Sequence, residues 1–161
     1  MKKKAVFLDR DGVVNKEIGD YTYKEEDFCL TDTIIPALQQ LTSKGYMLII
    51  ISNQGGIGKG LYSHAEVEKI HDKISSALWK NNIHITEFYY CPHHESSGKC
   101  LCRKPNSLMI EKAIARFGID KNQAWFIGDS QRDVDAAHKA GIKAIQIKPN
   151  ESLLEHIKKL D

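Results

Sequence analysis

Long apolar runs are missing from this chain of 161 residues. No segment approaches the ~20 apolar residues that a bilayer-spanning helix needs. The basic start, Lys2 to Lys4, is followed by a short apolar stretch at 5–8, whereas a secretory hydrophobic region needs roughly 7–15 residues. These absences predict a cytoplasmic protein with no secretory leader and no membrane partner.

The chain also has little net charge, no internal repeat, no low-complexity segment and no obvious linker. Lys and Arg total 23 against 21 Asp and Glu, which gives a net charge of +2. Nucleic-acid-binding domains usually show a basic stripe instead, so no nucleic-acid partner is predicted. On the rough prior of ~150 residues per domain, residues 1–161 form a single domain. We expect a monomer acting on a small molecule.

Cysteines are few and unevenly placed. Cys29 stands alone, while Cys91, Cys100 and Cys102 lie close together in the sequence with His93. In a reducing cytosol, such a cluster indicates a metal site before a disulfide. We expect Cys29, outside the cluster, to be a small buried apolar residue.

Short apolar runs alternate with amphipathic stretches along the chain. The predicted strands are 5–8, 47–51, 87–90, 124–127 and 143–147, and the predicted helices are 33–44, 63–81, 107–117, 132–140 and 151–160. This alternation is typical of an α/β fold with a doubly wound, Rossmann-like parallel sheet. Such sheets bind ligands at the carboxyl ends of their strands.

Polar residues gather after three of the predicted strands and before the predicted helix at 107. They are Asp9, Asp11, Ser52, Asn53, Arg103, Lys104, Asp129 and Asp133. Each piece alone is common in solvated turns. Because a parallel sheet brings its strand ends to one edge, together they indicate a site with acids, a hydroxyl and a fixed cation.

This constellation resembles the haloacid dehalogenase superfamily of phosphotransferases. The motifs Asp9-x-Asp11, Ser52, Lys104 and Gly128-Asp129 occur in the family's order, over about 5–147 of the chain. The resemblance implies a phosphoric monoester hydrolase that works through an aspartyl-phosphate. Asp9 would be the nucleophile, and Asp11 the general acid and base.

The same resemblance assigns the remaining residues. Asp9, the backbone carbonyl of Asp11, and Asp129 would hold Mg²⁺, a hard cation that prefers oxygen ligands. Asp133 would orient the lysine or a metal-bound water. The substrate and its phosphate would be bound by Ser52, Asn53, Arg103 and Lys104.

Three sulfurs and one imidazole form a complete tetrahedral set for structural Zn²⁺. The ligands would be Cys91, His93, Cys100 and Cys102. His94 is a competing imidazole that the sequence disfavours only weakly. A saturated site leaves no open position for water, so this zinc would not be catalytic. Since Arg103 and Lys104 follow the last ligand, the metal would stiffen the loop that presents both cations.

The zinc-binding loop narrows the resemblance. The runs 89–94 and 100–105, with the segments 9–15 and 53–60, look like the D-glycero-D-manno-heptose-1,7-bisphosphate 7-phosphatase group. The resemblance implies hydrolysis of a sugar phosphate, the 7-phosphate of a heptose bisphosphate, in carbohydrate metabolism. Histidinol phosphate stays an alternative substrate, because the stretch between His93 and Cys100 is short and close to the length found in the sister histidinol-phosphatases.

Two further expectations concern shape and class. The intervals between motifs leave no room for a large cap domain, so a capless fold must shield its site with loops at 16–28, 55–62 and the zinc-binding loop. A phospho-aspartate receiver module is the alternative of a different class. A receiver carries its phosphoacceptor after the third strand, where this chain has Cys91. A general acid two residues after the acceptor, as Asp11 is, suits turnover of the phosphoaspartate better than its persistence.

Overall fold

Five strands form one parallel sheet at the centre of the computed structural model, which describes residues 2–160. The strands are β1 (Lys3–Leu8), β2 (Met47–Asn53), β3 (Glu87–Cys91), β4 (Ile119–Gly128) and β5 (Lys143–Gln146). Their order across the sheet is β3-β2-β1-β4-β5, and every pair is parallel. The predicted doubly wound α/β fold is confirmed.

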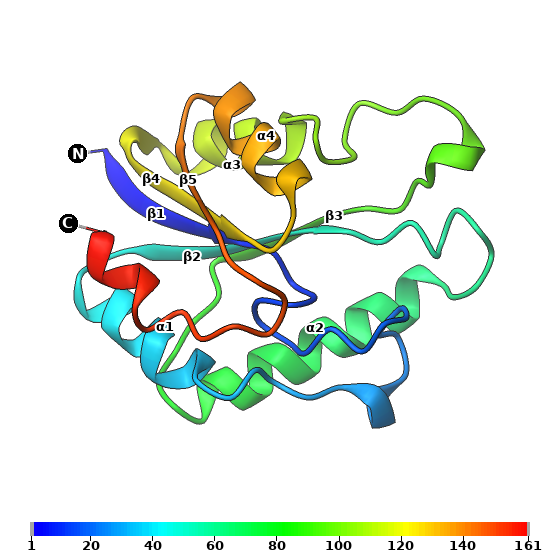
Figure 1. Ribbon diagram of the computed structural model, residues 1–161, viewed down its shortest axis with the longest axis horizontal. Helices are drawn as coiled ribbons and strands as arrows, with labels where there is room; N and C mark the ends of the chain where they lie inside the picture. The colour runs from blue at the N-terminus through cyan, green and yellow to red at the C-terminus, as the bar shows by residue number, and fades with distance from the viewer. Residues whose placement is uncertain (1, 161) are drawn as a thin grey trace.

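Helices cover both faces of the sheet (Figure 1). The helices α1 (Ile34–Ser43) and α2 (His64–Trp79) lie on one face, and α3 (Leu108–Phe117) and α4 (Gln131–Ala140) lie on the other. On β1, Val6 and Leu8 pack in the first layer, while Ala5 and Phe7 pack in the second. Because both faces are buried, β1 is apolar at every position over 5–8 and β2 over 47–51.

Local sequence signals set several helix ends. Ser63 and Glu66 form a capping box at the start of α2, and Ser130 and Asp133 form another at the start of α4. Gly118 ends α3 in the left-handed conformation that glycine adopts easily. The α4 capping box also places Asp133 beside the ends of β1 and β4.

The prediction of a closing helix over 151–160 is wrong. The structure has only a short 3₁₀ turn, η3 (His156–Lys159). Leu153 and Ile157 are buried as helical spacing requires, but the residues before them bond elsewhere: the Ser152 hydroxyl pairs with that of Thr33 at 2.7 Å. With its first turn used as an anchor, the segment is too short to repay helix nucleation.

Two smaller corrections concern β4 and Cys29. β4 begins at Ile119, earlier than predicted, because this buried residue pairs with Lys3 before the register shifts and pairing resumes at Ala124. Cys29 is exposed rather than buried. It belongs to an extended segment in which the neighbouring Phe28 packs against the core, so the alternation turns the thiol outward.

The strand order reverses beside β1. From β1 the chain builds outward to β2 and β3, and then returns to place β4 on the other side of β1. Loops therefore leave the carboxyl ends of β1 and β4 toward opposite faces and open a crevice between them. These ends lie on the right in Figure 1, away from both chain termini. Within residues 2–160, no helix is long and apolar enough to cross a membrane.

Candidate active site

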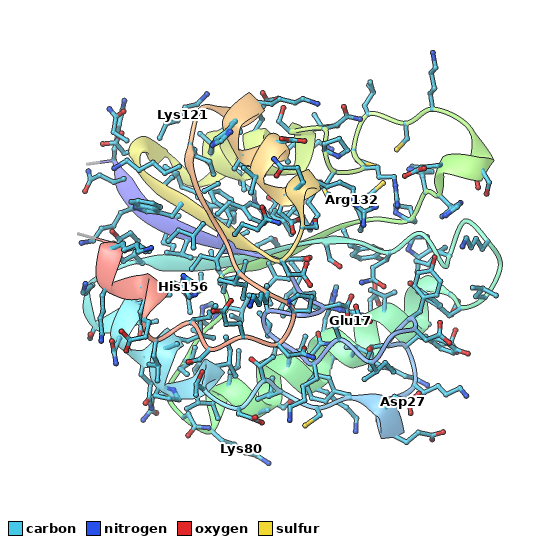
Figure 2. All side chains as sticks on the ribbon, viewed as in Figure 1. Glu17, Asp27, Lys80, Lys121, Arg132 and His156 are labelled. Carbon is cyan, nitrogen blue, oxygen red and sulfur yellow. The ribbon has the colours of Figure 1, made fainter. Side chains whose placement is uncertain are left out.

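A cavity of about 560 Å³ lies at the carboxyl ends of the strands. Seven of the predicted site residues line it: Asp9, Asp11, Asn53, Arg103, Lys104, Asp129 and Asp133. Glu17 and Arg132 also line it, from the segment after β1 and from the start of α4, and they lie on opposite sides of the strand ends (Figure 2). The eighth predicted residue, Ser52, is buried beneath this surface.

Lys104 lies at the centre of the charged groups. Its Nζ contacts Asp9 Oδ1 at 2.9 Å and Asp133 Oδ1 at 2.6 Å, and donates to the Ile51 carbonyl at 3.0 Å. Only 3% of the side chain is exposed. Burial alone would lower the pKa of Lys104, but the Asp9 and Asp133 carboxylates together raise it. The site therefore holds a permanent positive charge beside Asp9.

Three carboxylates crowd around this ammonium. One oxygen each from Asp9, Asp129 and Asp133 lie within 4.8 Å of one another. Burial, followed by the Asp133 and Asp129 charges, raises the pKa of Asp9 despite the opposing effect of Lys104. Burial and the Asp133 charge likewise raise the pKa of Asp129. A divalent cation would relieve this repulsion, and an oxygen-only donor set suits Mg²⁺.

The backbone around the carboxylates leaves no spare room. Gly12 has φ +84°, and a Cβ at this position would overlap the Asp129 carboxylate. Asp133 has both oxygens engaged: Oδ1 on Lys104, and Oδ2 on the Ser130 backbone N–H and hydroxyl at 3.1 and 2.9 Å. Both oxygens of Asp133 are therefore taken by Lys104 and the capping box of α4.

Asp11 is held through both carboxylate oxygens. Its Oδ1 accepts from Arg10 Nη2 and from Asn15 Nδ2, each at 2.9 Å. Its Oδ2 accepts from Gln54 Nε2 at 3.1 Å. Arg10 is completely buried, and its Nη2 also donates to the Thr22 carbonyl at 2.7 Å. The orientation of Asp11 thus depends on three polar neighbours.

The end of β2 supplies two predicted residues with different surroundings. Asn53 uses its whole amide on the backbone of Lys104, accepting from the N–H at 2.9 Å and donating to the carbonyl at 3.1 Å. Its contribution is therefore to fix Lys104. The Ser52 hydroxyl, 1% exposed as a residue, accepts from Gln54 Nε2 at 2.7 Å, which leaves its own proton for another acceptor.

The Cys/His cluster lies in the loop that leads from β3 to Lys104. Its four ligand atoms, from Cys91, His93, Cys100 and Cys102, all lie within 4.8 Å of one another. Cys91 Sγ lies 3.7 Å from Cys100 Sγ, near the ~3.8 Å that two thiolates span on tetrahedral zinc, and 2.7 Å from Cys102 Sγ, a separation that would have to widen around a bound ion. His94 turns away and bonds Ser96 instead, at 2.7 Å. The chemistry and spacing of this set fit Zn²⁺.

The loops around the cavity contact one another. Arg103 Nη1 donates to the His93 carbonyl at 3.1 Å, so this cation is tied to the cluster. Tyr62, which is buried and lies outside the cavity lining, contacts two residues of the segment after β1. Its ring meets the Tyr21 ring edge-on at 5.6 Å and stacks on the Tyr23 ring at 4.9 Å. The described residues contain no cap domain, and these loops border the site.

Sequence reasoning missed the residues that hold the acid. The sequence pattern assigns no role to Arg10, Asn15 and Gln54, which fall within the segments 9–15 and 53–60, or to Tyr62. The available signal was the position of Arg10 and Asn15 within seven residues of the end of a strand that two acids follow. Their burial and their convergence on Asp11 come from tertiary contacts.

Comparison with known proteins identifies the family. A HAD-hydrolase-like family model matches residues 101–160. The D-glycero-alpha-D-manno-heptose-1,7-bisphosphate 7-phosphatase of Photorhabdus laumondii is 40% identical over 147 residues, covering 88% of this chain and 80% of the relative. The corresponding beta enzyme of Haemophilus ducreyi is 38% identical over 149 residues, covering 89% and 81%.

A solved structure agrees with these relatives. The D,D-heptose 1,7-bisphosphate phosphatase of B. bronchiseptica, crystallised with magnesium and phosphate, superposes with a TM-score of 0.82 at 32% identity, covering 88% of this chain and 78% of that one. The parallel sheet, the acids at its switch point and these relatives lead to one assignment. The chain belongs to the D-glycero-D-manno-heptose-1,7-bisphosphate 7-phosphatase family of the HAD-like hydrolases.

Proposed function

We propose that the chain hydrolyses the 7-phosphate of D-glycero-D-manno-heptose 1,7-bisphosphate through an aspartyl-phosphate on Asp9. The observation that carries this proposal is the placement of Asp9. It lies at the switch point of the sheet, 2.9 Å from the Lys104 ammonium and grouped with the Asp129 carboxylate, with Asp11 two residues further along. The names of the relatives supply the substrate.

The reaction begins with attack of an Asp9 carboxylate oxygen on phosphorus. Oδ1 of Asp9 accepts from the Arg10 backbone N–H at 2.8 Å and from Lys104 Nζ at 2.9 Å, which fixes the carboxylate plane. As the Asp9–phosphorus bond forms, the bond from phosphorus to the sugar oxygen breaks, and that oxygen takes the proton of Asp11. Lys104 and the Ser52 hydroxyl stabilise the charge on the transferring group.

The second step regenerates the enzyme. Asp11, now a carboxylate, takes a proton from a water molecule, and the water oxygen attacks phosphorus. The bond between phosphorus and Asp9 then breaks and inorganic phosphate is released. One acid therefore serves both steps, first as proton donor and then as base.

Mg²⁺ fits the carboxylate group described above, and Asp9, the Asp11 backbone carbonyl and Asp129 would hold it. When bound, it supplies positive charge that offsets the phosphate and keeps the Asp9 carboxylate ionised. Burial and the neighbouring carboxylates raise the pKa of Asp9, and a cation beside these carboxylates would oppose that shift. We further propose that Cys91, His93, Cys100 and Cys102 hold a structural Zn²⁺. Burial raises the pKa of the Cys91 thiol, and a bound cation would favour its thiolate form.

The alternatives gain no support. The relatives reported above are named for heptose bisphosphate, not for histidinol phosphate. A receiver module carries its phosphoacceptor after the third strand. It would not explain why the candidate nucleophile Asp9 follows the first strand, or why the acid Asp11 lies two residues further along. The free thiols suit a reducing compartment, and we propose action in the cytoplasm as a monomer, which gel filtration of the purified protein tests.

The test is phosphate release from both anomers of the heptose bisphosphate with Mg²⁺ present, beside histidinol phosphate and a 3′-phosphorylated oligonucleotide. We expect the highest kcat/KM for a heptose bisphosphate. The Asp9→Asn protein should show no turnover, because an amide does not form the acyl phosphate, and beryllium fluoride should attach to Asp9 in the wild type. The exposed Asp27→Asn is the charge-matched control. Near-normal turnover by Asp9→Asn, or preference for another substrate, contradicts the proposal.

A further inference from the structure

A single buried amide joins the acid and the phosphate-binding hydroxyl. Gln54 is 1% exposed. Its Nε2 donates to Ser52 Oγ at 2.7 Å and to Asp11 Oδ2 at 3.1 Å. Its Oε1 accepts from the Tyr62 hydroxyl at 2.7 Å. The three hydrogen bonds of the Gln54 side-chain amide therefore go to Ser52 and Asp11 of the active site and to Tyr62 of the loop at 55–62.

The chemistry of the partners fixes which way the amide faces. Asp11 is a carboxylate when it acts as base in the second step, and a carboxylate only accepts hydrogen bonds, so the amide nitrogen faces Asp11 in that step. Oε1 then faces Tyr62, which must donate. Burial, the largest cause, raises the pKa of Tyr62, so the phenol keeps the proton that it donates. Tyr62 thus holds Gln54 in one of the two orientations open to an amide.

The two oxygens of Asp11 are not equivalent. Oδ1 accepts from Arg10 Nη2, from Arg10 Nε at 3.2 Å and from Asn15 Nδ2. A carboxylate oxygen with three donors around it, two of them on a guanidinium, is a poor place for a proton. Oδ2 accepts from Gln54 alone among the described residues, which leaves Oδ2 the less occupied of the two oxygens and the one open to the reacting groups.

We propose that Gln54 is a positioning residue for phosphoryl transfer, held in orientation by Tyr62. Its two N–H groups aim Asp11 Oδ2 and the Ser52 hydroxyl from one rigid amide. Because Ser52 Oγ accepts from Gln54, its own O–H is left to donate to the phosphoryl group. The proposal rests on the proposed function, since it concerns the acid and the hydroxyl of that mechanism.

The same amide connects the acid to the substrate-bordering loop. The Tyr62 ring packs so closely over Gly56 that a Cβ there would overlap it, and it also contacts the rings of Tyr21 and Tyr23 from the segment after β1. Tyr21 lines the cavity. The position of the segment after β1 therefore affects the position of Tyr62 and, through the Gln54 amide, that of Asp11.

The leaving group of the substrate separates positioning of the acid from a structural role. An alkyl oxygen, such as that of a sugar, needs a proton from Asp11 to depart, whereas nitrophenolate departs without one. Single-turnover release of nitrophenolate from 4-nitrophenyl phosphate, with enzyme in excess, reports phosphorylation of Asp9 alone. We compare that rate with single-turnover hydrolysis of the heptose bisphosphate.

The Gln54→Glu variant keeps the shape and the bond from Tyr62 but places an acceptor against Asp11 Oδ2. We expect the heptose bisphosphate rate to fall about 10²-fold, the scale of general acid catalysis. The nitrophenyl phosphate rate should fall at least about tenfold less, because only the alkyl ester needs the proton. Gln40→Glu, exposed on α1, makes the same charge change away from the site and should leave both rates unchanged.

Tyr62→Phe provides a second variant that adds no buried charge. The fall in the heptose bisphosphate rate relative to the nitrophenyl phosphate rate should be about a tenth of that in Gln54→Glu. The Gln54 amide loses only the hydrogen bond from Tyr62 and keeps its two donors. Equal losses on both substrates, or no loss on the heptose bisphosphate, would overturn the proposal. Failure of the proposed function looks different: the wild type would not hydrolyse the ester, or Asp9→Asn would retain phosphorylation.

Discussion

The carboxylate centre and the Cys/His cluster are two candidate metal sites assembled in opposite ways. The acids Asp9 and Asp129 come from distant parts of the chain and meet because β1 and β4 are neighbours in the sheet. The four ligands of the cluster all lie between residues 91 and 102. The first site exists only in the folded sheet, whereas the second is close to complete within one loop.

The two sites also differ in electrostatics. The carboxylate centre buries like charges around the Lys104 ammonium, and the pKa of Asp9 and of Asp129 is raised as a result. In the cluster, burial raises the pKa of the Cys91 thiol, while Cys100 and Cys102 are half-buried and His93 is exposed. They meet at one place, because Cys102 is followed directly by Arg103 and Lys104. Variants at each site in turn therefore measure how much the activity of the carboxylate centre depends on the Cys/His cluster.

Among the variants that test how the two sites are linked, the largest effect is expected for Lys104→Met, which removes the cation shared by Asp9 and Asp133. Loss of charge stabilisation on the phosphoryl group should reduce kcat by roughly 10²–10³-fold or more. Leaving buried carboxylates unpaired should lower the metal-free unfolding free energy by about 3–5 kcal/mol. Mg²⁺ should restore part of this stability, since it brings positive charge to the same carboxylates.

Urea unfolding with and without Mg²⁺, and phosphate-release kinetics, measure both effects. Lys99→Met, exposed on the same loop, is the matched control and should leave stability nearly unchanged. A Lys104→Met protein as stable as wild type without metal would show that the ion pairs around Lys104 contribute little.

Cys100→Ser tests whether the cluster positions the cations. The wild type should carry about one zinc per chain after dialysis against Mg²⁺. The variant should lose zinc, and a displacement of Lys104 by even ~1 Å should cost on the order of 10²-fold in rate. The strands that hold Asp9 and Asp129 do not depend on this loop, so circular dichroism and Mg²⁺ binding should be largely retained.

Cys29→Ser is the control, because Cys29 is an exposed thiol outside the cluster. Full activity in a zinc-free Cys100→Ser protein would separate the two sites functionally. Global unfolding of that variant would instead make the cluster part of the stability of the core, and the positioning argument would fail.

The smallest effect concerns the pH dependence of stability. Asp9 and Asp129 have raised pKa values in the folded protein, so the folded state binds more protons than the unfolded one above the ordinary carboxyl value of ~3.9. Their stabilising contribution is complete below that value and is lost as the pH rises through the raised folded values. Asp129→Asn removes one of the two acids.

We therefore expect the Tm of the metal-free wild type, relative to Asp129→Asn, to fall as the pH rises from about 4 toward neutrality. Mg²⁺ should reduce the pH dependence of the Tm in the wild type but not in Asp129→Asn. Thermal unfolding across that range, with the exposed Asp27→Asn as control, measures it. A relative Tm that rises with pH would show that the acids do not repel one another as the geometry implies.

Much of the fold could be predicted because its signals are local. Apolar runs placed the five strands, and the Ser63–Glu66 capping box with the glycine after α3 placed helix ends. The closing helix failed because Ser152 bonds Thr33, a residue far away in the chain. Cys29 failed because composition does not say which side of an extended segment meets the core.

For this protein, the sequence by itself determined the alternation of strands and helices, the positions of the acids after their strands, and the Cys/His set in one loop. Each of these depends on residue order over a short stretch. Only the tertiary structure decided that Asn53 clamps the Lys104 backbone and that Gln54, oriented by Tyr62, bonds both Ser52 and Asp11. Buried polar side chains take whichever partners the packed strands and loops bring within about 3 Å, and sequence spacing does not contain that information.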